Sequence, residues 1–195
     1  MDKEKEKKIL DKLKEEERES VMMTGFIRER VFEFLTARKG YAETDIELDA
    51  PFVVETERAR DTCSVDFIVS LGGKRLIAIK CAPSALESRE RHILAFSRVM
   101  DCIPFSVVTD SICARVLKTD TGELLSEDLS SLPGRSEALS MLENPGKEKK
   151  PSYPEEKLKK ERCILLAFNA IRCSVPNACP SGKGNGVKTI PLKFK

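Results

Sequence analysis

The 195-residue sequence has no tryptophan, two tyrosines and one histidine. A single-strand-binding surface of stacked aromatic side chains would therefore depend on the nine phenylalanines, most of which lie in core-like apolar patterns, so this function is not expected. The histidine, His92, lies in a helical pattern without a serine or cysteine partner suggested by motif. This argues against a hydrolase triad and favours a surface or helix-packing role.

Long apolar runs are also absent. The longest, from Cys163 to Phe168, has six residues, whereas a helix that crosses a bilayer needs roughly 20. The first eight residues contain no apolar stretch of the secretory kind, and we expect a cytoplasmic protein without membrane association. Seven cysteines, an odd number in a reducing compartment, argue against a disulfide framework.

The cysteines are explained better as small buried residues than as metal ligands. Cys163, Cys173 and Cys179 are separated by nine and five residues, which is not the C-x-x-C spacing typical of zinc or iron–sulfur sites. Cys163 falls on the apolar stripe of a helical pattern, and others adjoin strand-like or apolar segments (Cys81, Cys102 and Cys113). A metal or cluster site built from them is not expected.

Charge is distributed unevenly although the net charge is only +2. Residues 147–195 hold 12 Lys or Arg and 4 Asp or Glu, whereas residues 1–146 hold 22 and 28. The basic end is a candidate contact for a polyanion such as DNA, because its lysines and arginines could bind phosphates in a salt-dependent way. A role of these lysines in solubility alone explains the pattern equally well.

The chain divides into four segments. Residues 1–20 are almost entirely charged and predict an exposed helix, and residues 21–143 carry the alternating and helical apolar patterns of one folded domain. Residues 144–154, rich in proline, predict a linker. Residues 155–195 predict a basic helix, about Glu155–Arg172, followed by an irregular tail.

Within the domain, helices and short strands alternate. Thr24 is a plausible N-cap for a helix over about 25–39 that buries Phe26, Ile27 and Val31 and ends at Gly40. Strand-like runs and two further helices follow (Ile46–Leu48, Phe52–Glu57, Ser64–Leu71, Arg75–Cys81, the helix Ser84–Met100, Phe105–Thr109, Ala114–Thr119 and the helix Arg135–Leu142). The order predicts an α/β fold, a small mixed sheet flanked by helices.

A hairpin over residues 65–80 is the most informative stretch. Its two strands meet at Gly72-Gly73, and the loop length decides which side chains share a face. A three-residue loop that includes Lys74 sets Asp66 opposite Lys80 and leaves an apolar face of alternate residues (Val65, Phe67, Val69, Ile77 and Ile79). A two-residue loop would scatter the charges over both faces, which is unfavourable because a buried unpaired charge is costly. We therefore expect the first register.

An aspartate and a lysine paired across neighbouring strands, near the end of a sheet, suit phosphodiester hydrolysis. The carboxylate can bind Mg²⁺ through hard oxygen ligands, and the ammonium can orient an attacking water. An ordinary cross-strand ion pair explains the spacing of Asp66 and Lys80 as well.

An ordered series of segments resembles the N-terminal domain of type I restriction enzyme R subunits, in the PD-(D/E)xK nuclease-like superfamily. The resemblance covers roughly residues 20–135 (Phe26–Leu35, Lys39–Tyr41, Asp45–Glu47, Val65–Val69, Lys74–Lys80 and Ala82-Pro83). It implies a restriction-endonuclease-like fold, Mg²⁺-dependent cleavage of DNA, Asp66 as metal ligand and Lys80 as catalytic lysine. It also implies an assisting acid in the first core helix, Glu29 or Glu33, of which Glu29 is preferred.

One position departs from the family pattern. Ala78 stands two residues before the lysine, where the family has Glu or Gln. An acid from the following helix, Glu87 or preferably Glu90, would compensate as a metal ligand and catalytic residue, with Arg89 and Arg91 to bind phosphates. A solvated helix surface is the simpler interpretation of these residues.

Two function classes follow. One is a Mg²⁺-dependent deoxyribonuclease, and the other is a catalytically inactive nucleic-acid-binding or scaffold protein that retains the fold. Lys157 and Lys160 belong to a basic patch on the last helix that could clamp a phosphate backbone. The resemblance further implies a protein partner, such as a helicase or methyltransferase subunit.

Overall fold

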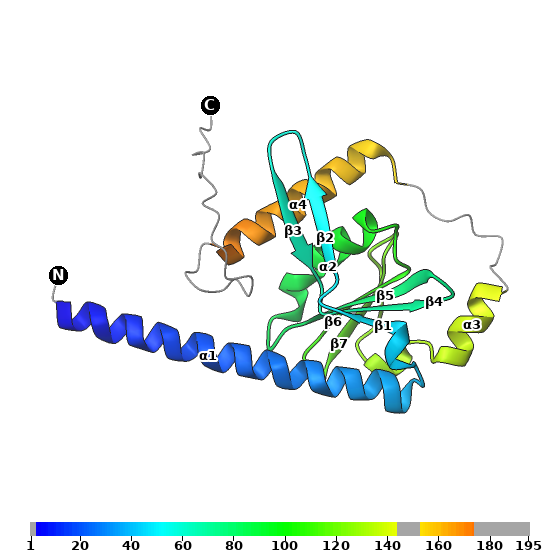
Figure 1. The fold of residues 1–195 in the computed structure, drawn as a ribbon, viewed down its shortest axis with the longest axis horizontal. Coiled ribbons are helices and arrows are strands. Elements are labelled where there is room, and N and C mark those ends of the chain that lie inside the picture. The colour runs from blue at the N-terminus through cyan, green and yellow to red at the C-terminus, as the bar shows by residue number, and fades with distance from the viewer. Residues whose placement is uncertain (1–2, 144–152, 174–195) are drawn as a thin grey trace.

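The computed structural model describes residues 3–143 and 153–173 (Figure 1). The helices are α1 (Lys3–Glu33), α2 (Leu86–Val99), α3 (Arg135–Glu143) and α4 (Glu155–Cys173), with a π-helical turn and two 3₁₀ turns (Phe34–Arg38, Glu43–Asp45 and Leu129–Ser131). The strands are β1 (Ile46–Leu48), β2 (Pro51–Glu55), β3 (Arg60–Ser64), β4 (Phe67–Leu71), β5 (Lys74–Cys81), β6 (Phe105–Thr109), β7 (Ala114–Lys118) and β8 (Leu124–Ser126).

Six strands form one mixed sheet in the order β1-β4-β5-β6-β7-β8. β5 and β6 are parallel because α2 crosses between them, and the other neighbours are antiparallel. β2 and β3 form a separate antiparallel hairpin. The expected small mixed sheet flanked by helices is confirmed.

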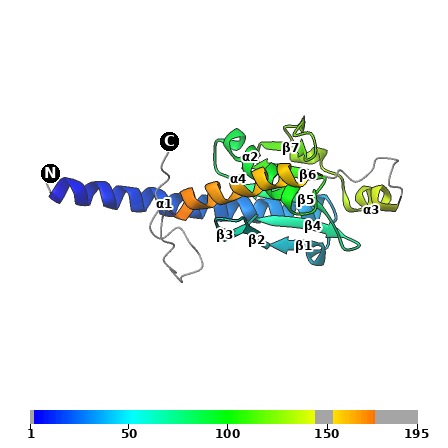
Figure 2. The ribbon, with the colours of Figure 1, turned by 90° about the horizontal axis from the view of Figure 1, so that it is seen from above.

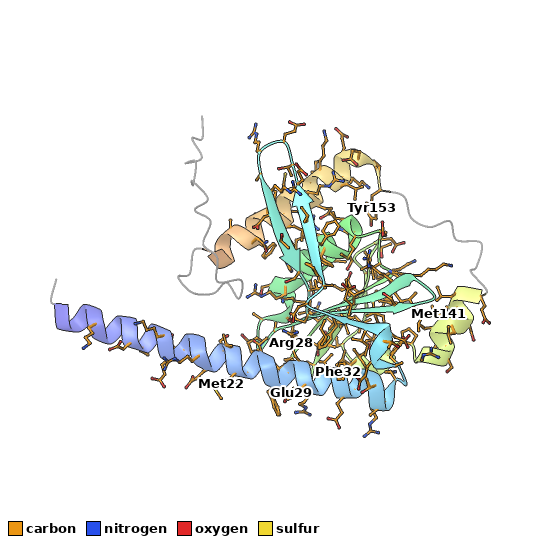
Figure 3. All side chains as sticks on the ribbon, in the orientation of Figure 1. Met22, Arg28, Glu29, Phe32, Met141 and Tyr153 are labelled. Atoms are coloured by element: carbon orange, nitrogen blue, oxygen red, sulfur yellow. The ribbon has the colours of Figure 1, made fainter. Side chains whose placement is uncertain are left out.

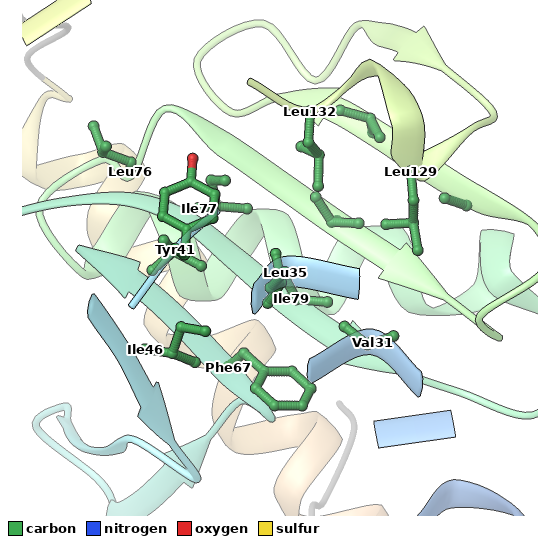
Figure 4. Close-up of a cluster of buried hydrophobic side chains, with 14 of the residues drawn as sticks. Val31, Leu35, Tyr41, Ile46, Phe67, Leu76, Ile77, Ile79, Leu129 and Leu132 are labelled. Atoms are coloured by element: carbon green, nitrogen blue, oxygen red, sulfur yellow. The ribbon is translucent and has the colours of Figure 1, made fainter. Parts of the chain in front are cut away.

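Helices cover both faces of the sheet (Figure 2). On one face, Ile27, Val31 and Leu35 pack against alternate side chains of β4 and β5, and Figure 4 shows the centre of this cluster. On the other face, α2 and α4 contribute buried residues such as Phe96 and Leu165. The central strands therefore have apolar side chains on both faces, as their near-continuous hydrophobic sequences require.

The first helix differs from the prediction. α1 runs without a break from Lys3 to Glu33, and the hydroxyl of Thr24, expected to be an N-cap, donates a hydrogen bond to the Ser20 carbonyl within it. Phe26, expected in the core, is exposed. The prediction of the helix end is confirmed, because Gly40 has a φ of +73° and its N–H bonds to the Thr36 carbonyl.

The segment predicted as one strand over Ser64–Leu71 is two. β3 ends at Ser64, the chain bends at Val65 and Asp66, and β4 begins at Phe67. Val65 consequently packs on the α2 face, whereas Phe67 and Val69, with which it was expected to share a face, pack on the α1 face. The bend places Asp66 at the start of β4.

The later helices agree with their patterns. α2, α3 and α4 lie within two residues of the predicted bounds, and His92 is buried with its ring 5.2 Å from that of Phe168 on α4. Burial is confirmed for Cys81 and Cys102, whereas Cys113 and Cys163 are exposed.

Most of the predicted linker and all of the tail beyond Cys173 lie outside the described residues. In the part of the chain that is described, no helix has both the length and the apolar character that crossing a membrane requires.

Candidate functional site

The hairpin β4–β5 sets the geometry of the site, by a route different from the predicted one. Its loop has two residues, Gly72 and Gly73, with φ of +55° and +74°, so the three-residue loop is wrong. The register then shifts between Val69 and Ser70, because Leu76 is an extra residue in β5. This bulge restores the predicted register, in which Asp66 stands opposite Lys80, because Phe67 pairs with Ile79. Leu76 itself packs in the cluster on the α1 face.

Asp66 and Lys80 meet at the end of this hairpin. The Lys80 ammonium nitrogen lies 2.8 Å from Oδ2 of Asp66, and the Cys81 N–H donates to the same oxygen at 2.8 Å. Asp66 is 4% exposed and Lys80 9% exposed. The two charges are therefore a buried pair, in which each group compensates the other for the loss of water.

Arg28 on α1 completes an ion cluster. Its guanidinium donates to Oδ2 of Asp49 at 2.7 Å, its Nε lies 3.8 Å from Oδ1 of Asp66, and it stacks over the Phe67 ring at 5.8 Å. The hydrogen bond to Asp49 raises the pKa of Arg28 further above its ordinary value. We refer to Arg28, Asp49, Asp66 and Lys80 as the edge cluster.

Cys81 borders the edge cluster but is not activated by it. Burial raises the pKa of its thiol to about 12, and the carboxylate of Asp66 adds to this rise. The nearby cations, Lys80 and Arg28, lower the pKa by less than burial raises it. A thiol in this state is protonated and a poor nucleophile at neutral pH.

Glu90, the predicted second acid, is engaged elsewhere. Lys80, Val108 and Arg115 are successive partners across β5, β6 and β7, and Glu90 accepts a hydrogen bond from Arg115. Glu90 therefore lies over the same face as Lys80, but its partner stands two strand spacings away, about 10 Å. Glu87 lies near the same arginine, 3.7 Å from its Nη1.

The acids of the first helix, Glu29 and Glu33, are both exposed. Glu29 lines an open pocket of about 220 Å³ together with Arg28, Phe32, Leu48 and Phe67. Figure 3 shows Arg28, Glu29 and Phe32 on the part of α1 that passes beneath the sheet. Glu29 thus lies next to the edge cluster, whereas no contact of Glu33 with it is present among the interactions of the described residues.

The carboxylate oxygens of the edge cluster are not arranged to bind a Mg²⁺ ion. Mg²⁺ is held by oxygen ligands at about 2.0–2.1 Å. The Asp66 oxygens already face Lys80, the Cys81 N–H and Arg28, and Ala78 is fully buried among apolar residues at the position of the family's second acid. Within residues 3–143 and 153–173, no three histidine, cysteine, aspartate or glutamate side chains are grouped to hold a metal.

The four predicted nucleic-acid-binding residues lie on two helices that pack together, α2 and α4. Arg89, Lys157 and Lys160 are exposed. Arg91 lies 2.6 Å from Oε2 of the buried Glu161, which joins the two helices. Lys157 precedes Glu161 by four residues, one turn of α4.

Sequence reasoning missed Arg28 and Asp49. Arg28 directly follows the core residue Ile27, so its position on the helix pattern shows that it borders the buried face. Asp49 has a φ of +49°, and its N–H bonds to the Asp66 carbonyl. No local pattern identifies this contact, because it joins residues 17 apart through the turn after β1.

Comparison with known proteins identifies the domain. The family model described as "Type I restriction enzyme R protein N terminus (HSDR_N)" matches residues 25–133, more than half of the chain. No curated protein and no solved structure matches. The matched range begins in α1, includes the whole edge cluster and ends after β8, and the mixed sheet with its flanking helices is consistent with a nuclease-like fold.

Proposed function

The chain belongs to the family defined by the N terminus of type I restriction enzyme R proteins, and on that basis we propose that it is a nuclease-related domain that binds DNA without hydrolysing it. The observation that carries this proposal is the state of Asp66. Both of its carboxylate oxygens face cations or an N–H group. The position two residues before Lys80, where the family has Glu or Gln, is occupied by the buried Ala78. The edge cluster then has a structural role: its ion pairs connect Arg28 on α1 to Asp66 and Lys80 on the β4–β5 hairpin.

DNA contact is assigned to the basic surface of α2 and α4. Arg89, Arg91, Lys157 and Lys160 come from two helices on the face opposite α1, where Glu161 holds α2 and α4 together. Cations on such a surface neutralise phosphates and release counterions, which gives salt-dependent binding without base readout.

Mg²⁺-dependent hydrolysis of DNA is the second candidate. It is favoured by one observation, the 2.8 Å separation of Asp66 and Lys80 at the strand ends, where the resembled nucleases use an aspartate and a lysine. Metal binding would require Asp66 to exchange its cationic partners for the ion. Glu90 would have to leave Arg115 to act as a second ligand of the ion.

The predicted protein partner is a helicase or methyltransferase subunit.

Incubation with supercoiled plasmid and Mg²⁺ or Mn²⁺ distinguishes the two candidates. We expect the full chain to retard the plasmid in a gel without nicking or linearising it. Cleavage that is lost in both Asp66→Ala and Lys80→Ala, with each variant shown by circular dichroism to be folded at the assay temperature, would establish hydrolysis and overturn the proposal.

Charge reversal tests the binding surface. Lys157→Glu/Lys160→Glu removes two candidate phosphate-binding cations, so the slope of log K against log salt concentration should become shallower by about 0.9 for each phosphate of duplex DNA that is no longer neutralised. Lys7→Glu/Lys14→Glu makes the same change in net charge at two exposed lysines of α1 and is the matched control. Equal weakening by both double variants would show that overall charge, not this surface, determines binding.

A further inference from the structure

The part of α1 before Thr24 extends away from the sheet (Figure 1). Every side chain that the structure describes in this part of the helix is exposed. Helices in proteins gain most of their stability by packing an apolar face against a neighbour, and less from intrinsic propensity. A helix that projects in this way therefore gains stability if a second helix covers one of its faces.

Large apolar side chains of α1 face solvent close to the point where the helix leaves the domain. Met22 is 75% exposed, Met23 53% and Phe26 58%. Figure 3 shows Met22 on the side of α1 that points away from the sheet. Met23 and Phe26 are three residues apart, so they are neighbours on the helix surface. Exposed apolar patches of this kind mark interaction sites in soluble proteins.

Charged residues of opposite sign continue this apolar surface at its two ends. Glu19 precedes Met23 by four residues, and Arg30 follows Phe26 by four. At about 100° of rotation for each residue, the four side chains point within a sector roughly 60° wide, with the spacing of a coiled-coil seam. We refer to Glu19, Met23, Phe26 and Arg30 as the α1 stripe. The core residue Ile27 points about 70° away from the centre of this sector, so packing in the core leaves the stripe uncovered.

The two charges of the α1 stripe are available to a partner. Among the described residues, neither Glu19 nor Arg30 takes part in an ion pair within the chain. The Arg30 guanidinium lies over the Phe26 ring, 5.6 Å from its centroid, and so stays beside the apolar part of the stripe. A second helix that covers Phe26 would meet this cation as well.

We propose that α1 pairs with α1 of a second copy of this chain, in antiparallel orientation, through the α1 stripe. In the register we propose, Phe26 of each copy faces Met23 of the other, and Arg30 of each faces Glu19 of the other. The seam then has apolar contacts at its centre and an ion pair at each end. The inference goes beyond the proposed function and does not depend on it.

The charges of the stripe determine the orientation. In a parallel pair each residue of the seam lies beside its own counterpart, so Glu19 would oppose Glu19 and Arg30 would oppose Arg30. The antiparallel pair replaces both repulsions by attractions. It also places the folded domain of each copy beside the projecting part of the other copy's helix, whereas a parallel pair would bring both domains to the same level.

One contact beyond the seam joins like charges. Glu16 comes level with Glu33 of the second copy in the antiparallel register. Lys12 lies 3.7 Å from Glu16 within the same helix and compensates its charge. Glu16 and Glu33 are both exposed, so solvent further weakens their repulsion.

Light scattering after size-exclusion chromatography tests the pairing in the full chain. We expect the mean mass to rise with protein concentration from 21.8 kDa towards twice this value. Met23→Glu/Phe26→Glu should hold the mass at that of one chain, because it replaces the apolar centre of the seam by carboxylates. Val21→Glu/Ile112→Glu makes the same change in charge at two exposed apolar residues outside the stripe and should leave the dimer intact.

Exchange of charges tests the orientation. Arg30→Glu and Glu19→Arg should each raise the dissociation constant of the dimer roughly tenfold, because each places like charges at both ends of the seam. The combined variant Glu19→Arg/Arg30→Glu reverses both ion pairs and should restore the dissociation constant to near its original value. In a parallel pair the combination would restore nothing, since like charges would still oppose each other.

Three results would overturn the proposal. A mass of one chain at every concentration would show that a second copy does not cover the stripe. A dimer that survives Met23→Glu/Phe26→Glu would show that another surface holds it. A dimer that the combined charge variant fails to restore would contradict the antiparallel seam. Each variant should keep the cooperative urea unfolding of the domain, because all the substituted side chains are exposed.

Discussion

The Lys80 ammonium nitrogen lies 2.8 Å from Oδ2 of Asp66, and the two side chains are enclosed where β4 begins and β5 ends. Asp66 and Lys80 stand opposite each other because Leu76, four residues before the lysine, forms a bulge that shifts the register of β5 by one residue. A buried ion pair of this kind adds little net stability, yet the loss of one partner leaves the other uncompensated.

A double-mutant cycle should therefore show strong coupling. Asp66→Asn and Lys80→Met should each lower the free energy of unfolding by about 3–5 kcal/mol, and the loss in the double variant should be smaller than the sum by about 1 kcal/mol or more. Urea unfolding measures all four proteins. The exposed pair Lys12 and Glu16, 3.7 Å apart on α1, is the control and should couple by less than about 0.5 kcal/mol. Additive losses at Asp66 and Lys80 would contradict the coupling.

The raised pKa of Cys81 predicts a loss of stability in alkali. The thiol has a pKa of about 12 in the folded chain against an ordinary value of 9.0, so between these pH values the unfolded chain releases the proton and the folded chain retains it. Its contribution to the free energy of unfolding should fall by up to about 1.4 kcal/mol for each pH unit above 9.

Substitution isolates this contribution. Cys81→Ala should flatten the decline of stability between pH 9 and 11 relative to the unmodified chain, as measured by urea unfolding. Cys113→Ala, at an exposed cysteine, is the control and should leave the pH dependence unchanged. Identical slopes for the Cys81 variant and the unmodified chain would refute the assignment.

Glu161 should hold α4 on the domain. Its carboxylate is buried and lies 2.6 Å from Arg91 and 3.0 Å from Arg98. Glu161→Gln retains the shape and removes the charge, so the free energy of unfolding should fall by about 1.5–3 kcal/mol, with faster hydrogen exchange in α4. Glu155→Gln alters an exposed pair with Arg162 and should cost less than about 1 kcal/mol. An equal effect of the two substitutions would contradict this role.

A hydroxyl network under α2 should be sensitive to the removal of a single oxygen. Ser106 lies between the hydroxyls of Ser97 and Thr119 at 2.7 and 2.8 Å, and all three residues are fully buried. Ser106→Ala leaves two buried hydroxyls with one partner fewer, which should cost about 1–3 kcal/mol in urea unfolding. Ser140→Ala on α3, where the hydroxyl is exposed, should change stability by less than about 0.5 kcal/mol.

Elements with strong local patterns could be predicted from the sequence. The helical spacing of α2 and the short β-branched runs of β4 and β5, bounded by the turn at Gly72 and Gly73, predict the correct element types. The hairpin loop could not be predicted, since a two-residue turn with a bulge and a three-residue loop lead to the same register at Asp66. The partners of Asp66 on α1 and after β1 depend on tertiary packing, which no local pattern encodes.

α1 gives the molecule a hydrodynamic signature. Ile27 and Val31 fix its last turns in the core, while the same uninterrupted helix continues to Lys3, away from the sheet (Figure 1). Such a body rotates faster about the long axis of the helix than end over end. Nuclear spin relaxation should consequently vary with the direction of each N–H bond, so amides along α1 would relax differently from those in strands that cross it.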